Sequence, residues 1–190
     1  MTTNLADLPA DLPAPADDGA CDHLPGTAVP AVSLPSTGGR AVDLAVLPPG
    51  RTVVYAYPMT GVPSGPLPRG WDAIPGARGC TPQSCAFRDH HADLAALGAG
   101  VFGFSTQSTA YQREMVERLH LPFEVLSDAG LRLTQALRLP TFEADGMTLL
   151  KRLTLVVRDG TIEHAFYPVF PPNRSAGQVL DWLRANPLQG

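Results

Sequence analysis

The most constraining feature of this chain is the order in which strand-like and helix-like segments follow one another. Residues 52–57 (Thr-Val-Val-Tyr-Ala-Tyr) are β-branched and aromatic, which predicts a buried central strand. Further strands are expected at 101–105, 122–126, 153–158 and 161–167, and helices from Pro82 to about Gly98, over 109–120, over 128–137 and from Asn173 or Ser175 onward. The pair Asp159-Gly160 is a tight-turn signal that joins the last two strands in a hairpin.

Strands and helices that alternate and then end in a hairpin and a helix predict a thioredoxin-like α/β fold, a central mixed sheet flanked by helices. The length of 190 residues suits one domain. Residues 1–25 are rich in proline, alanine and aspartate, show no hydrophobic period and are expected to lie as an arm over the surface. The domain is therefore expected to span residues 26–190, beginning with a short strand at 31–34.

Composition excludes several classes of function. A net charge of −4 gives no electrostatic argument for binding nucleic acid or a membrane surface, and no apolar run approaches the roughly 18 residues that span a bilayer. The first residues lack the basic and apolar segments of a signal peptide. Three cysteines are an odd, low number that argues against a secreted disulfide scaffold and predicts a cytoplasmic protein.

The two cysteines of residues 79–89 (GCTPQSCAFRD) occupy the start of a predicted helix. Thr81 and Pro82 are typical of a first helical turn, so Cys80 lies at the positive end of the helix, where an anionic thiolate is favoured. Arg78 and Arg88 add positive charge nearby. A thiolate attacks peroxides and disulfides, and the resulting sulfenic acid condenses with a second thiol, for which Cys85 is the candidate.

Helix geometry constrains how these two thiols can react with each other. Five residues along an α-helix correspond to a rise of about 7.5 Å and a rotation of about 140°. A disulfide usually needs Cα atoms within about 6.8 Å and side chains that face each other. A bond between Cys80 and Cys85 therefore requires the first turn or more of the helix to unwind.

Other interpretations of the cysteines stay open at this point. The pair at Cys80 and Cys85 suits two small apolar helix residues, and a zinc site is conceivable because His90 and His91 follow. Structural zinc sites, however, usually separate paired cysteines by about two to four residues and need four convergent ligands. The histidines, His120 included, are expected at the surfaces or boundaries of helices. Cys21 has no partner by spacing and is interpreted as a passive thiol or, alternatively, as an extra redox partner or the site of an intermolecular disulfide.

The cysteine motif and the order of elements together resemble the peroxiredoxins. The resemblance is closest to the Q-type, or bacterioferritin comigratory protein, subfamily, in which a resolving cysteine follows the peroxidatic cysteine by five residues. It covers roughly residues 26–185. The segments similar to that family are 57–58, 79–89, 104–105, 121–123, 126–128 and 151–154.

This resemblance implies a thiol-dependent peroxidase that reduces hydrogen peroxide or organic hydroperoxides. By position, Cys80 corresponds to the peroxidatic cysteine, Cys85 to the resolving cysteine, Arg152 to the arginine that stabilises the thiolate and the peroxide, and Pro58 to the proline that shields the site. The family needs no metal or organic cofactor. It takes electrons from a thioredoxin- or glutaredoxin-type reductant, and its members are monomers or dimers.

Two functions of other classes remain as alternatives. A thiol–disulfide oxidoreductase or redox sensor would use the same cysteines with little turnover of peroxide. A non-enzymatic module that binds a metal or a partner protein would retain its metal or its partner on purification.

The sequence departs from the family pattern immediately before Cys80. Ala73 and Ala77 stand where the family has proline and a hydroxyl residue, and some fifteen extra residues within 59–78 separate Pro58 from Cys80. Thr60 supplies the missing hydroxyl if the insertion loops out and returns, and Thr81 is the second candidate. Trp71 and Ile74 either pin this insertion or line a substrate entrance, and pinning is favoured. The apolar run at 166–172 is expected to close the core.

Overall fold

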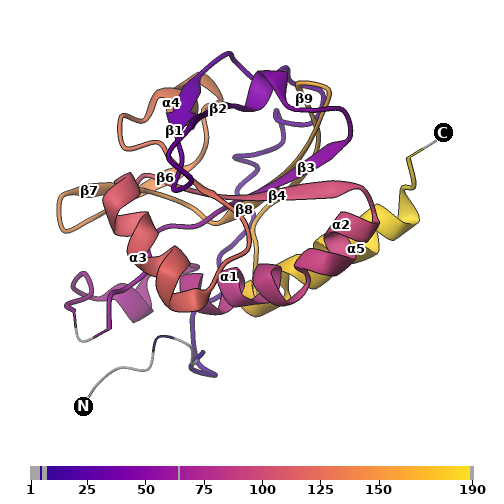
Figure 1. Ribbon diagram of the computed structural model, residues 1–190. Helices are drawn as coiled ribbons and strands as arrows, with labels where there is room; N and C mark the ends of the chain where they lie inside the picture. Colours follow the sequence, from indigo (N-terminus) through magenta and orange to yellow (C-terminus); the bar gives the residue numbers. More distant parts are fainter. Residues whose placement is uncertain (1–4, 6–7, 64, 189–190) are drawn as a thin grey trace.

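A five-stranded mixed sheet forms the centre of the protein (Figure 1). The structure is a computed structural model that describes residues 5, 8–63 and 65–188. The strands lie in the order β5 (Val125–Ser127), β4 (Ala99–Ser105), β3 (Arg51–Ala56), β8 (Leu153–Arg158) and β9 (Thr161–Phe166). The first three are parallel, and β8 runs antiparallel to both β3 and β9. The predicted thioredoxin-like α/β class is confirmed.

Both faces of the sheet are covered, because successive side chains of a strand point to opposite sides. Val53 and Tyr55 of β3 pack beneath four helices: α1 (Cys80–Asp89), α2 (His91–Ala96), α3 (Thr109–Leu119) and α5 (Ser175–Ala185). Val54 and Ala56 face the opposite layer, which contains β1 (Ser33–Pro35), β2 (Ala41–Asp43) and α4 (Arg132–Ala136). Short 3₁₀ helices occupy Leu44–Val46, Trp71–Ala73 and Pro172–Arg174.

The N-terminal arm contributes to the second of these layers. Cys21 and Leu24 are buried in the core that also contains α4, whereas residues 8–27 contain no helix or strand. Asp18 accepts hydrogen bonds from Lys151 Nζ at 2.7 Å and from Tyr167 Oη at 2.8 Å. The arm is therefore anchored in the core at its end, and before that by the hydrogen bonds of Asp18 and by apolar contacts of Leu5, Leu8 and Pro15 with the body.

A small third core holds the insertion in place. Met59, Trp71 and Ala77 pack against Ala144 and Leu149. The last two come from a hairpin of β6 (Thr141–Ala144) and β7 (Met147–Leu150). The sequence analysis did not predict this hairpin. Trp71 is buried with its ring 6.2 Å from that of Phe142, so the expected pinning of the insertion by Trp71 is observed.

Several predicted boundaries were wrong. The helix expected from Pro82 to Gly98 begins at Cys80 and is broken at His90 into α1 and α2. The strand expected at 122–126 is β5, and α4 covers only the middle of 128–137, although Asp128 caps it by accepting the amide protons of residues 132–134. In α5, Val179 and Leu183 are buried as expected.

Trp182 of α5 is only partly buried. Its ring stacks on His164 with centroids 4.9 Å apart, and the Arg51 guanidinium lies 5.0 Å above it. It thus closes the edge of the sheet rather than its centre. Val169 and Pro172 of the apolar run are buried, which agrees with core closure. In the described part of the chain, no helix is long and apolar enough to cross a membrane.

Candidate functional site

Cys80 is the first residue of α1, directly after a glycine whose conformation only glycine adopts easily. Gly79 has φ +107°, and a Cβ at this position would collide with Pro172 and would lie 2.9 Å from Leu8 Cδ2. The first helical hydrogen bond runs from the Gln83 amide to the Gly79 carbonyl at 3.0 Å. Cys80 is 3% exposed. A buried thiol therefore lies at the positive end of the helix, as the sequence predicted.

Arg152 places a positive charge directly beside this sulfur. It lies between β7 and β8, and its Nη2 donates to Cys80 Sγ at 3.2 Å. The same nitrogen lies within 3.3 Å of the carbonyl oxygens of Gly76, Ala77 and Arg78. The planar guanidinium therefore fixes the loop before Cys80 and the thiol at the same time.

Gln83 orients Arg152 and was not identified from the sequence. It is fully buried, and its Oε1 accepts a short hydrogen bond from Arg152 Nη1. Its Nε2 donates to Ser175 Oγ at 3.3 Å, and Ser175 in turn pairs with Thr154 Oγ1 at 3.3 Å. A residue three positions after Cys80 lies on the same helix face, and this spacing is the one signal that could have revealed it.

Cys85 lies further along α1 and is only half-buried. Cys80 and Cys85 are both free thiols, and α1 is continuous between them. Burial raises the pKa of the Cys85 thiol, and this effect outweighs the opposing charge of Arg88. Cys85 is therefore protonated at neutral pH while α1 is intact. Cys21 is buried, and desolvation together with the carboxylate of Asp18 raises its pKa to about 12, which fits a passive thiol.

The inserted segment loops out and returns to Cys80, which is the condition for the Thr60 hydroxyl to replace the one missing before the cysteine. Met59 and Gly61 line the pocket at Cys80, and Thr60 between them is 1% exposed. The Thr60 amide donates to Gln107 Oε1 at 3.2 Å and its carbonyl accepts from Tyr111 Oη at 2.9 Å, whereas its hydroxyl has no partner among the described residues. Pro58 and Thr81 are buried as well.

The pocket at Cys80 is very small. Its volume is about 10 Å³, which corresponds to about one water molecule. Its walls are Leu5, Met59, Gly61, Leu67, Trp71, Arg78, Gly79 and Thr81. Trp71 thus both pins the insertion and lines the entrance, whereas Ile74 borders a different cavity.

The histidines lie away from this pocket. His90 pairs with Asp93 at 3.2 Å, His91 contacts the ring of Phe123, and His120 ends α3 in a left-handed conformation. These are boundary positions of helices, as expected. Within residues 8–63 and 65–188, no group of three or more His, Cys, Asp or Glu side chains is arranged to hold a metal ion.

Comparison with known proteins assigns the family. The Redoxin profile matches residues 24–180, most of the chain, and the chain therefore belongs to the Redoxin family. The resemblance to peroxiredoxins that the cysteine motif predicted is confirmed.

Individual relatives agree with this assignment. The chloroplastic peroxiredoxin Q of Oryza sativa subsp. japonica is 32% identical over 161 residues, which are 84% of this chain and 66% of the relative. The chain thus spans about two thirds of that relative's length. The crystal structure of peroxidoxin BcpB from Mycobacterium tuberculosis superposes with a TM-score of 0.71 at 26% identity. The match covers 87% of this chain and 100% of the BcpB chain. Peroxiredoxin Q of Xanthomonas campestris, at 20% identity, TM-score 0.67 and 86% and 97% coverage, shares the fold.

The contact between Arg152 and Cys80 predicts a reactive thiol. Arg152→Met should slow alkylation of Cys80 by iodoacetamide about tenfold or more at neutral pH, because the thiolate loses its charged hydrogen-bond donor. Arg152→Lys keeps the positive charge but loses the planar guanidinium with its several donors, so its alkylation rate should lie between those of wild type and Arg152→Met. The rates are measured by mass spectrometry of the Cys80 peptide, with exposed Arg158→Met as the matched control. An Arg152→Met protein alkylated at the wild-type rate would contradict this interpretation.

Proposed function

We propose that this chain is a thiol-dependent peroxidase of the peroxiredoxin Q type. The single observation that supports this most strongly is the buried Cys80 sulfur at the start of α1, 3.2 Å from the Arg152 guanidinium. Membership in the Redoxin family and the similarity to proteins named peroxiredoxin Q point to the same activity.

In the first step Cys80 is the nucleophile. Its thiolate attacks one peroxide oxygen, an S–O bond forms, the O–O bond breaks, and the other oxygen leaves as water or an alcohol after taking up a proton. Arg152 stabilises the thiolate and the negative charge that develops on the leaving oxygen, since a guanidinium stays charged and donates several hydrogen bonds. The buried Cys80 is converted to a sulfenic acid.

In the second step Cys85 resolves the sulfenic acid. The Cys85 sulfur attacks the Cys80 sulfur, a disulfide forms and the hydroxyl leaves as water. Because α1 holds the two thiols apart, its first turn opens before this step. A thioredoxin- or glutaredoxin-type dithiol then reduces the disulfide, in a compartment we expect to be the cytoplasm.

The mass of the protein after one equivalent of hydrogen peroxide tests this scheme. Wild type should lose two hydrogens as the disulfide forms, Cys85→Ser should gain one oxygen as a sulfenic acid that dimedone, when added, converts to a thioether adduct, and Cys80→Ser should stay unchanged. Cys21→Ser is the control and should behave as wild type.

Peroxide consumption with thioredoxin, thioredoxin reductase and NADPH completes the test. Turnover that persists in Cys80→Ser excludes the proposed nucleophile. Disulfide formation without turnover would instead favour a thiol–disulfide oxidoreductase or redox sensor.

We further propose that the Thr60 hydroxyl replaces the hydroxyl missing at Ala77. It is buried, lacks a partner among the described residues, and lies in the segment that lines the Cys80 pocket. A buried hydroxyl without a partner is costly, and a bound peroxide oxygen would satisfy it. Pro58, buried beside this segment, would shield the pocket from water.

Thr60→Val keeps the shape of the side chain and removes the hydroxyl. It should lower the second-order rate constant of Cys80 with hydrogen peroxide by about tenfold or more, as loss of one preorganised donor does elsewhere. The rate constant is measured by stopped-flow tryptophan fluorescence or by competition with a second peroxidase. Thr81→Val is the matched control. A loss confined to Thr81→Val would assign the role to Thr81 instead.

A further inference from the structure

The N-terminal arm lies directly over the loops that surround Cys80. Leu5 lines the Cys80 pocket, and a Cβ at Gly61 would lie 2.8 Å from Leu5 Cδ2. Leu8 packs against Gly79 in the same way, with Cδ2 2.9 Å from where a Cβ would lie. Both glycines flank Cys80 in space, and the absence of a side chain lets the arm approach their backbone closely. Leu5 thus lines the pocket at the cysteine, and Leu8 packs on the glycine that precedes it.

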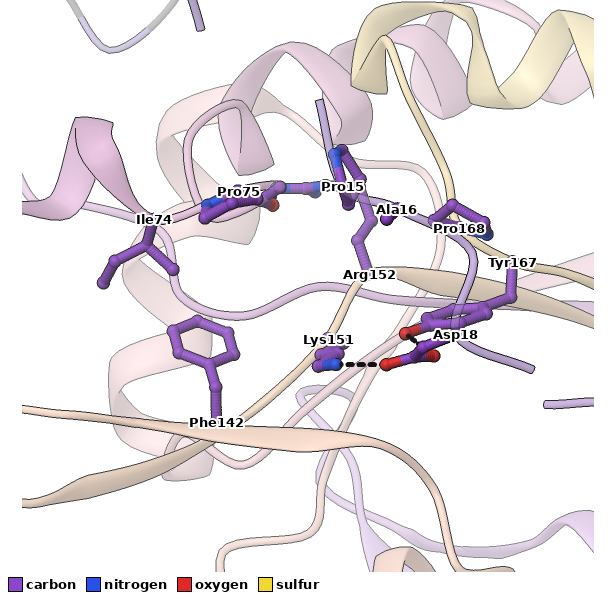
Figure 2. Close-up of a pocket in the computed structure, with 11 residues that line it drawn as sticks. Pro15, Ala16, Asp18, Ile74, Pro75, Phe142, Lys151, Arg152, Tyr167 and Pro168 are labelled. Carbon is purple, nitrogen blue, oxygen red and sulfur yellow. Dashed lines mark hydrogen bonds and ion pairs between the residues drawn. The ribbon is translucent and has the colours of Figure 1, made fainter. Parts of the chain in front are cut away.

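The arm between these leucines and the core is held by few contacts. Figure 2 shows Pro15 and Ala16 passing above Arg152, with Asp18 bonded to Lys151 and Tyr167. Hydrogen bonds from Lys151 and Tyr167 lower the pKa of Asp18 to about 2, so this carboxylate stays charged at neutral pH. Ion pairs between exposed side chains contribute little stability.

A cavity of about 330 Å³ separates this part of the arm from the body (Figure 2). Ile74, Pro75, Phe142 and Pro168 form its apolar walls, and no residue is shared with the pocket at Cys80. The cavity leaves part of the apolar surface of the arm without packing contacts, although Pro15 touches Gly76, with its Cγ 3.3 Å from where a Cβ would lie. We call the arm before its anchor at Asp18 the strap. Because residues 8–27 contain no helix or strand, its first part can be removed without disturbing either.

The strap explains why the Cys80 pocket has room for only about one water molecule. Among its other walls, Trp71 packs in the third core and Gly79 directly precedes α1. Leu5 is the wall that comes from the loosely held arm. A hydrogen peroxide molecule is little larger than water, whereas the organic group of an alkyl or aryl hydroperoxide needs the space that Leu5 fills.

We propose that Leu5 and Leu8 are specificity determinants that restrict Cys80 to hydrogen peroxide and other small hydroperoxides. The proposal rests on the peroxidase function proposed above. Removing residues 1–10 leaves the anchors at Asp18 and Leu24 in place and opens the pocket toward solvent. The truncated protein accepts bulky hydroperoxides that the full chain excludes.

The test compares the rate constants of two peroxides with the full chain and with the protein that lacks residues 1–10. Truncation should raise the rate constant with cumene hydroperoxide about tenfold or more, and should change that with hydrogen peroxide less than about twofold. Leu5→Ala should give a smaller shift in the same direction, and it serves if the truncated protein does not fold. Val46→Ala, at an exposed apolar residue far from the arm, is the matched control. A ratio of the two rate constants that does not change overturns the proposal.

Alkylation separates this proposal from the peroxidase function. Truncation should speed the reaction of Cys80 with N-phenylmaleimide about tenfold or more relative to its reaction with methyl methanethiosulfonate, which is much smaller. If no variant consumes peroxide but this ratio changes, the strap is correct and the peroxidase function is wrong. If peroxide is consumed but truncation changes neither the ratio of the two thiol reagents nor the ratio of the two peroxides, only the proposal for the strap is wrong.

Discussion

The Arg152 guanidinium is the group on which the rest of the site depends. It is 3% exposed, and no described carboxylate pairs with it. Its hydrogen bonds go to three carbonyl oxygens, to Gln83 and to the Cys80 sulfur. A buried cation is strongly unfavourable unless polar acceptors surround it, and these carbonyl oxygens, Gln83 and the Cys80 sulfur are the acceptors that do so. The same hydrogen bonds fix the loop that begins α1.

The two halves of α1 are held by different kinds of contact and are expected to respond differently to oxidation of Cys80. Its first turn is tied to Arg152 and Ser175 through Gln83. Its second half is fixed by Phe87, whose ring stacks on Tyr55 with centroids 4.3 Å apart in the core. Oxidation of Cys80 to a neutral sulfenic acid removes the thiolate that balances Arg152, and this weakens the polar contacts of the first turn. The apolar contact of Phe87 does not depend on that charge. Opening is therefore expected in the first turn, while the second half stays in place.

The sequence was sufficient wherever local rules decide the structure. The pattern of 52–57, the Asp159-Gly160 turn and the helix start at Thr81 and Pro82 each favour one local conformation, so the central strand, the last hairpin and the position of the thiol could be predicted. Arg152 could be proposed only through a family resemblance, because an arginine next to a strand is ordinary by itself.

The remainder depends on contacts between distant segments. The break of the predicted long helix at His90 involves no glycine or proline. The hairpin of β6 and β7 is too short for a clear period and gains its stability from the insertion, which itself has no pattern. In the sequence, Gln83 is an ordinary polar helix residue. Its role follows only from its contacts with Arg152 and Ser175 in the folded chain. The Cys80 pocket likewise exists only because Met59, Trp71 and Leu5 of the arm meet there in space.

Hydrogen exchange of α1 tests the central claim that the disulfide forms through opening of its first turn. The protein is compared before and after oxidation by one equivalent of hydrogen peroxide, with Cys85→Ser as the form that cannot close the bond. In the oxidised wild type, the amides of residues 81–85 should exchange much faster, while the amide of Phe87 stays protected. A Cys80–Cys85 disulfide in a protein whose α1 amides exchange as slowly as in the reduced form would contradict the account.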